Sequence, residues 1–84
     1  MSKRELVEKI EQAYKMVIAV SGRLFGIIRD EEDRLTIVER NHRESAKRYT
    51  DTNQMISRYK IDGKPLRDYT DAITIVQYTA LLDA

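Results

Sequence analysis

The segment from Met16 to Ile28, MVIAVSGRLFGII, constrains the fold more than any other part of the chain. Apolar side chains dominate it, and Arg23 is its only charged residue. A transmembrane helix needs about 20 apolar residues, so this run is too short to be one. The segment is therefore expected to form the buried centre of the protein.

A helix is expected to begin at Ser2, because Ser2 followed by Glu5 forms a capping box. Apolar residues then recur at heptad spacing, and this phase continues unbroken through Met16–Ile28. Beyond Met16, apolar side chains cover every side of such a helix, which indicates burial all round. The heptad positions are Leu6, Ile10, Ala13, Val17, Val20, Leu24 and Ile27.

A β-hairpin is the alternative for the same segment. Ser21 and Gly22 would form a two-residue turn between KMVIAV and RLFGII, whose β-branched residues favour strands. Two glycines inside a helix would also cost about 1 kcal/mol each relative to alanine. The heptad phase favours the helix, and a bend near Gly22 or Gly26 would reconcile the two interpretations.

Two further helices are expected. The acidic run Asp30–Asp33 predicts a helix start, because Asp caps helices and negative charge is favourable in the first turn. Asp62 and Gly63, with Pro65 close behind, predict a break. The final segment, Leu66–Ala84, then predicts a shorter third helix, although its AITIVQYT run has high β propensity and makes a strand the alternative.

The predicted fold is therefore all-α, a single helical domain of residues 1–84 with helices at about 3–29, 31–60 and 65–82. A core in a chain of this size rarely supplies more than about 3–5 kcal/mol. Cysteine is absent and His42 is the only histidine, so neither disulfides nor a metal site are expected as support. The helical bundle is expected to be completed by oligomerisation.

The expected function is non-catalytic, because no catalytic, metal-binding or phosphate-binding motif occurs. No cofactor and no small-molecule substrate are expected. Protein–protein contact is predicted instead, with a second copy of the chain and with an unidentified protein partner; Gly22 and Gly26 would let another helix approach closely. The predicted interface consists of Val17, Ile18, Gly22, Leu24, Phe25, Gly26, Ile28, Ile75, Tyr78 and Leu82.

Nucleic-acid binding is an alternative function. Arg40, Arg43, Lys47 and Arg48 could contact phosphates from one side of the second helix. Acidic residues such as Glu44 are interleaved with them, and the formal net charge is only +1, so a solvated, salt-bridged face is favoured. A peripheral partner of a membrane protein is a further alternative. The absence of cysteine and of a signal peptide pattern predicts a cytoplasmic location.

The stretch EQAYKMVIAVSGRLFGIIRDEEDR, together with the short chain and the missing cysteine, resembles small accessory proteins of T-even-type bacteriophages. One group of these proteins modulates lysis by binding other proteins, including the cytoplasmic part of a membrane-embedded holin. The resemblance implies a cytoplasmic, non-enzymatic regulator. It assigns no functional residue to this chain.

Overall fold

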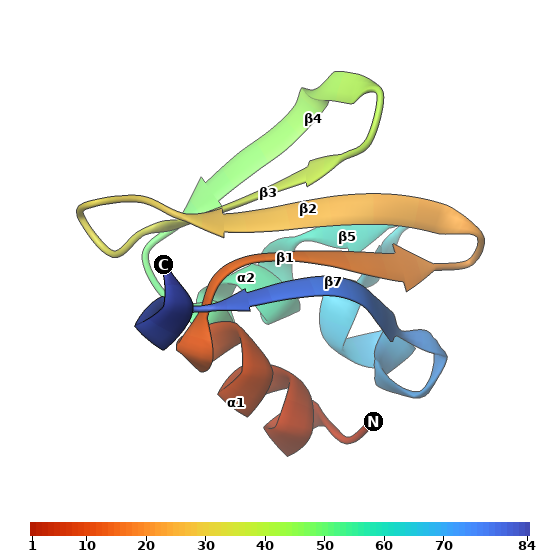
Figure 1. Ribbon diagram of the computed structural model, residues 1–84. Helices are drawn as coiled ribbons and strands as arrows, with labels where there is room; N and C mark the ends of the chain where they lie inside the picture. Colours follow the sequence, from red (N-terminus) through yellow and green to blue (C-terminus); the bar gives the residue numbers. More distant parts are fainter.

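A five-stranded antiparallel sheet, with helices gathered on one side of it, forms the protein in a computed structural model that describes residues 1–84 (Figure 1). The prediction of an all-α fold is therefore wrong. The sheet consists of β1 (Ala13–Val20), β2 (Arg23–Arg29), β3 (Leu35–Glu39), β4 (His42–Tyr49) and β7 (Thr74–Ala80), in the order β4-β3-β2-β1-β7. The helical elements are α1 (Lys3–Gln12), α2 (Thr52–Arg58) and the 3-10 helices η1 (Leu66–Ala72) and η2 (Leu81–Asp83).

Helix α1 begins where the sequence predicts and ends much earlier. The Ser2 side chain accepts a hydrogen bond from the Glu5 N–H at 3.1 Å, which confirms the predicted cap. The helix ends at Gln12, and Ala13 opens strand β1 directly. Arg29 of β2 stabilises this helix end, because its guanidinium donates to the carbonyl oxygens of Ile10 at 2.8 Å and Ala13 at 3.1 Å. The last carbonyl groups of a helix have no N–H donor from a following turn. The buried Arg29 side chain provides a donor for them here.

The segment Met16–Ile28 is a β-hairpin, not a helix, so the alternative interpretation is confirmed. Ser21 and Gly22 both adopt positive φ, at 52° and 74°, and Val20 pairs with Arg23 across the two-residue turn. Turns of this kind match the right-handed twist of the strands that they join. The heptad phase was misleading because apolar residues on both faces of two strands also satisfy a spacing of three and four.

The acidic run Asp30–Asp33 forms the turn between β2 and β3 instead of starting a helix, so the helix predicted at 31–60 is wrong for most of its length. The Asp30 carboxylate accepts hydrogen bonds from the N–H groups of Glu32 at 2.9 Å and Arg34 at 3.0 Å. Asp favours turns for this reason, because its side chain bonds to the backbone a few residues ahead. Only α2, capped by Asp51, is helical in this part of the chain.

The last part of the chain confirms the predicted break and then departs from the predicted helix. Asp62 and Gly63, both with positive φ, form the turn between the two-residue strands β5 (Lys60–Ile61) and β6 (Lys64–Pro65). The short helix η1 follows, and Thr74–Ala80 is strand β7, paired with β1. The strand alternative is thus confirmed for AITIVQYT, whose β-branched and aromatic residues suit a sheet.

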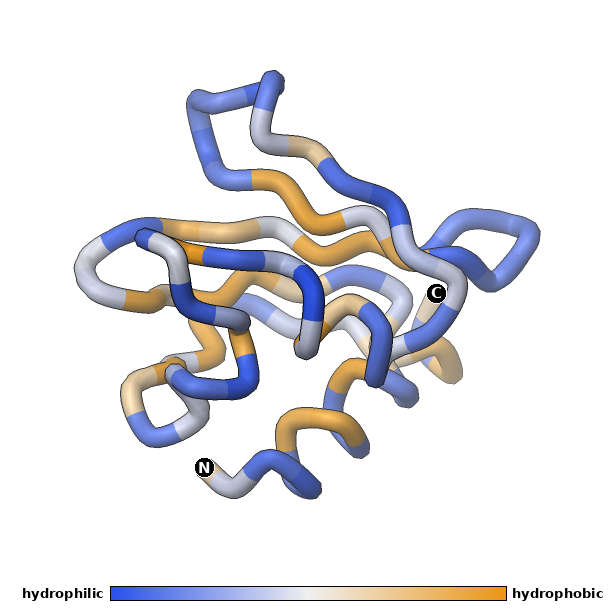
Figure 2. Tube along the Cα trace, turned by 180° about the vertical axis from the view of Figure 1, so that it is seen from behind, coloured by the Kyte–Doolittle hydropathy of each residue, from blue (hydrophilic) through white to orange (hydrophobic).

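The core lies between the sheet and α1, α2 and η1. Phe25 is buried there and meets Tyr59 edge-on, with ring centroids 6.2 Å apart. The Cα radius of gyration, 11.6 Å, is close to the roughly 12 Å typical of a compact chain of this length. Figure 2 shows the hydrophobic segments concentrated along the central strands, with hydrophilic residues at the tip of the β3–β4 hairpin.

Candidate binding surface

The face of the sheet opposite the helices is not covered by any element, and we call it the open face. Side chains alternate along β1, so that Met16, Ile18 and Val20 point into the core while Val17 and Ala19 point the other way. Cross-strand pairs carry this arrangement over the neighbouring strands. The open face of β1 to β3 consists of Lys15, Val17, Ala19, Leu24, Gly26, Ile28, Thr36 and Val38.

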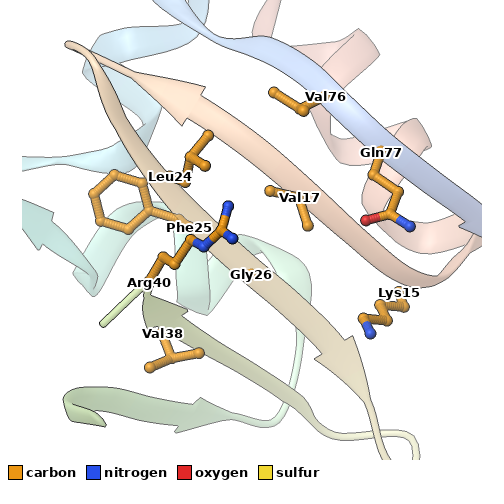
Figure 3. Close-up of a pocket in the computed structure, with 9 residues that line it drawn as sticks. All are labelled: Lys15, Val17, Leu24, Phe25, Gly26, Val38, Arg40, Val76 and Gln77. Atoms are coloured by element: carbon orange, nitrogen blue, oxygen red, sulfur yellow. The ribbon is translucent and has the colours of Figure 1, made fainter. Parts of the chain in front are cut away.

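A shallow hollow of about 380 Å³ occupies the middle of the open face (Figure 3). Val17 pairs with Gly26, and Gly26 pairs with Val38, so these three residues line up across the central strands. A Cβ atom on Gly26 would meet Val38 Cγ1 at 3.9 Å, which is ordinary contact, so the glycine deepens the hollow without being required by packing. The lining residues are Lys15, Val17, Leu24, Phe25, Gly26, Val38, Arg40, Val76 and Gln77.

Two cations lie at the hollow, and neither has an ion-pair partner. Figure 3 shows Val17 near the middle, with Arg40 to one side and Lys15 to the other. The Arg40 N–H donates to the Leu24 carbonyl at 2.8 Å, which fixes the backbone of Arg40 beside β2. None of the nine lining residues carries a carboxylate. The hollow is therefore an apolar surface with unneutralised positive charge.

Arg23, in contrast, is fully engaged on the inner side of the sheet. Its guanidinium donates two hydrogen bonds to the Glu39 carboxylate, at 2.7 and 2.9 Å, and a third to Asp62 at 3.0 Å. These bonds hold the pKa of Glu39 below its usual value, although partial burial opposes the shift. The cluster joins β2 and β3 to the turn between β5 and β6, which is a structural role.

The predicted interface residues do not form one surface. Val17, Leu24, Gly26 and Ile28 lie together on the open face, where a partner could reach them. The other six predicted residues lie elsewhere. Ile18 and Phe25 are buried in the core, and Ile75 and Tyr78 pack against the core from β7. Gly22 lies in the β1–β2 turn, and Leu82 in η2 is 98% exposed.

The interface prediction missed Lys15, Val38, Val76 and Gln77, and it assigned Arg40 to nucleic acid alone. All five line the hollow. The period-two alternation of β1 could have placed Lys15 on the same face as Val17, once the hairpin was chosen. Placing Val76 and Gln77 at the hollow would have required the knowledge that β7 pairs with β1.

The four basic residues assigned to the second helix lie on the β3–β4 hairpin instead. Arg48 pairs with Thr36 of the open face, whereas Lys47 pairs with Ile37, which belongs to the core face. Lys47 lines a second hollow of about 320 Å³, on the inner side of β4. Arg40 lines the hollow on the open face, and Arg43 is exposed on β4. The predicted cluster is therefore divided between the two sides of the β3–β4 hairpin.

His42 is the only histidine of the chain, and its charged neighbours are the carboxylates of Glu39 and Glu44. His42 is exposed beside the β3–β4 turn, and its Nδ1 lies 3.2 Å from Glu44 Oε1. No group of three or more His, Cys, Asp or Glu side chains is arranged to hold a metal ion. Four of the five tyrosines lie in the core or at its edge: Tyr59 is buried, and Tyr49, Tyr69 and Tyr78 pack against the core.

No helix in the structure combines the length and the apolar character needed to cross a membrane. Comparisons of the chain with protein-family models, with curated proteins and with solved structures gave no match.

Proposed function

We propose that the protein is a non-catalytic binding module that acts by protein–protein contact through its open face. The observation that carries this proposal is the hollow itself: an apolar floor over three central strands, two unpaired cations and no carboxylate. An antiparallel sheet with one solvated face usually alternates apolar residues inside with polar residues outside. Here Val17, Leu24 and Val38 occupy positions where polar side chains would be normal, and exposed apolar patches of this kind mark interaction sites.

The chemistry of the surface specifies the partner class. A protein segment with apolar side chains next to aspartate or glutamate would bury its apolar groups on Val17, Leu24 and Val38, and its carboxylates would reach Lys15 and Arg40. Apolar contact with these side chains would supply the main attraction, and the entropy lost on association would offset part of it. The charges at the rim act mainly on specificity and on the association rate.

A second copy of the chain fits this face less well. If two copies met face to face, the cations of each would approach a surface that carries apolar groups, the uncharged Gln77 and further cations, and no carboxylate. Such pairing leaves charges without partners, which disfavours it. The open face is therefore assigned to a different protein, and self-association stays a prediction that must use another surface.

Nucleic-acid binding is less well supported for the open face. Proteins that bind single-stranded nucleic acid stack bases on aromatic side chains. Phe25 is the only aromatic residue at the hollow, and its side chain is 1% exposed, so it offers no stacking surface. The alternative stays a prediction, now for the basic residues of β4 rather than for a helix.

A role as a cytoplasmic regulator follows from the resemblance to phage accessory proteins and from the absence of cysteine. Regulators of that group act by contact with other proteins, which is the mode proposed here. A partner that is itself a membrane protein is compatible with this role, because the open face requires only a segment outside the membrane that carries apolar side chains next to carboxylates.

The test uses two synthetic peptides that differ only in charge, one alternating leucine with glutamate and the other leucine with lysine. NMR titration of the ¹⁵N-labelled protein should show shifts at Val17, Leu24 and Val38 with the glutamate peptide and much weaker shifts with the lysine peptide. Arg40→Glu should reverse this preference. Equal binding of both peptides, or shifts confined to another surface, would contradict the proposal.

A further inference from the structure

Strand β7 forms one edge of the sheet and has an unpaired side. Its only neighbour is β1, and none of the backbone hydrogen bonds outside helices and strands involves residues 74–80 (Figure 1). The N–H and C=O groups that point away from β1 therefore lack partners in the protein. Unpaired groups along a sheet edge are a template for another strand.

The composition of β7 does nothing to prevent such pairing. Its sequence, TIVQYTA, contains no charged residue, no proline and no glycine, and it is rich in residues that favour strands. The opposite edge strand β4, HRESAKRY, carries Arg43, Glu44, Lys47 and Arg48. Charged side chains are the usual means by which proteins protect an edge. One edge of this sheet thus carries charged side chains, and the other carries none.

A bulge is the only irregularity in the middle of β7. Val17 pairs with Gln77 and Ile18 pairs with Ile75, so Val76 is an extra residue on β7. The Val76 side chain is 56% exposed. The pairing from Gln77 to Thr79 is regular, and a second register shift, at Tyr14 of β1, precedes the last pair, Ala13 with Ala80.

We propose that β7 pairs antiparallel with β7 of a second copy and joins two five-stranded sheets into one of ten strands. Antiparallel pairing of identical edges places a two-fold axis perpendicular to the sheet, so that each residue contact occurs twice. The same axis keeps the open faces of both copies on one side. Because Val76 and Gln77 line the hollow, the hollows of the two copies then lie on either side of the paired β7 strands, on the same face of the joined sheet.

The second copy is the occupant favoured by charge. An uncharged strand can lie against itself without placing like charges opposite each other, which is destabilising in antiparallel pairs. The same copy meets unpaired cations if it approaches the open face. The edge pairing does not depend on the proposed acidic partner, since it uses the backbone of β7 and leaves Lys15 and Arg40 accessible.

Sedimentation velocity of the purified chain, at concentrations from about 1 μM to about 1 mM, tests the proposal, because dissociation constants within this range give a measurable mixture of monomer and dimer. The wild-type chain should show a reversible monomer–dimer equilibrium. The double variant Val76→Lys/Gln77→Lys puts charge in the middle of the edge, and it should weaken the dimer at least tenfold. Ala46→Lys, which adds the same charge type to the exposed part of β4, is the matched control and should leave the dimer unchanged.

Circular dichroism of each variant shows that the fold is retained, which is expected because all three side chains are exposed. A wild-type chain that stays monomeric at the highest concentration would overturn the proposal. So would a dimer that survives the double variant, or one that Ala46→Lys weakens equally. The peptide titration is independent of these outcomes, so failure of the dimer and failure of the open-face proposal can be told apart.

Discussion

The two faces of the β1–β2 hairpin have similar composition and different environments. Met16, Ile18 and Phe25 point toward the helices and are at most 1% exposed, whereas Val17 and Leu24 on the other face remain partly exposed. Hydrophobicity alone therefore does not decide which apolar residues of this hairpin are buried. The alternation of the strands and the position of α1, α2 and η1 decide it, and the uncovered apolar face becomes available for binding.

The largest expected contrast lies between two adjacent residues, Phe25 and Leu24. Phe25→Ala should reduce the free energy of unfolding by about 3–5 kcal/mol, because it removes the edge contact with Tyr59 and leaves a cavity. Leu24→Ala should change it by less than about 0.5 kcal/mol, as is usual at the surface. Urea denaturation followed by circular dichroism measures both values. Equal losses would mean that the open face is covered in solution.

Two basic residues on opposite faces give the next contrast. Arg29→Met should cost about 1–3 kcal/mol, because the carbonyl oxygens of Ile10 and Ala13 lose the buried guanidinium donor, and the Ile10 oxygen keeps only the Ala13 N–H. Lys15→Met on the open face removes the same charge and should have almost no effect on stability. Amide exchange should also speed up at the end of α1 in the Arg29 variant alone. A stable Arg29→Met protein would show that water replaces the guanidinium at these carbonyls.

Acid sensitivity should arise on the inner side of the sheet. Bonding to Arg23 lowers the folded-state pKa of Glu39, so ionised Glu39 stabilises the fold above its unfolded pKa of about 4.3, and this contribution disappears as the pH falls through the lower folded value. Asp30, whose pKa is lowered by backbone hydrogen bonds, acts in the same direction.

In the wild type, the urea midpoint should decline as the pH falls from about 5 to about 3. Glu39→Gln should make this decline smaller, and the remaining decline should be the contribution of Asp30. Arg40→Gln on the open face is the control, because Arg40 has no carboxylate partner, and its profile should parallel that of the wild type. An unchanged profile for Glu39→Gln would show that the Arg23 cluster contributes nothing to acid stability.

The sequence predicted local features better than the fold. Ser2 with Glu5, and Asp62 with Gly63, were correctly assigned to a helix cap and a break, because each depends on side chain or backbone preferences within a few residues. The choice between helix and hairpin for Met16–Ile28 depended instead on partners distant in the chain. Strand β7 covers one flank of β1 and β3 lies beside β2, and neither pairing is encoded within the segment itself.

The candidate surface was predictable only in part for the same reason. Val17, Leu24, Gly26 and Ile28 were assigned to an interface because the segment has more apolar residues than one core requires, and the structure does leave them outside the core. Assigning Ile18 and Phe25 to that interface followed from the helix interpretation, which makes all sides equivalent. In a strand, a shift of one residue reverses the face, so only the correct secondary structure could separate the two sets.

The two glycines of the hairpin give the smallest expected contrast. Gly22→Ala should destabilise the protein by about 1 kcal/mol, because its φ of 74° is strained for any residue with a Cβ atom. Gly26→Ala should be neutral or stabilise slightly, since its Cβ would make only ordinary contact with Val38. The added methyl group would nevertheless fill part of the hollow, so binding of the glutamate peptide should weaken in Gly26→Ala and not in Gly22→Ala. Melting curves and the NMR titration measure the two effects separately, and weakened binding in both variants would mean that the turn, rather than the hollow, contacts the peptide.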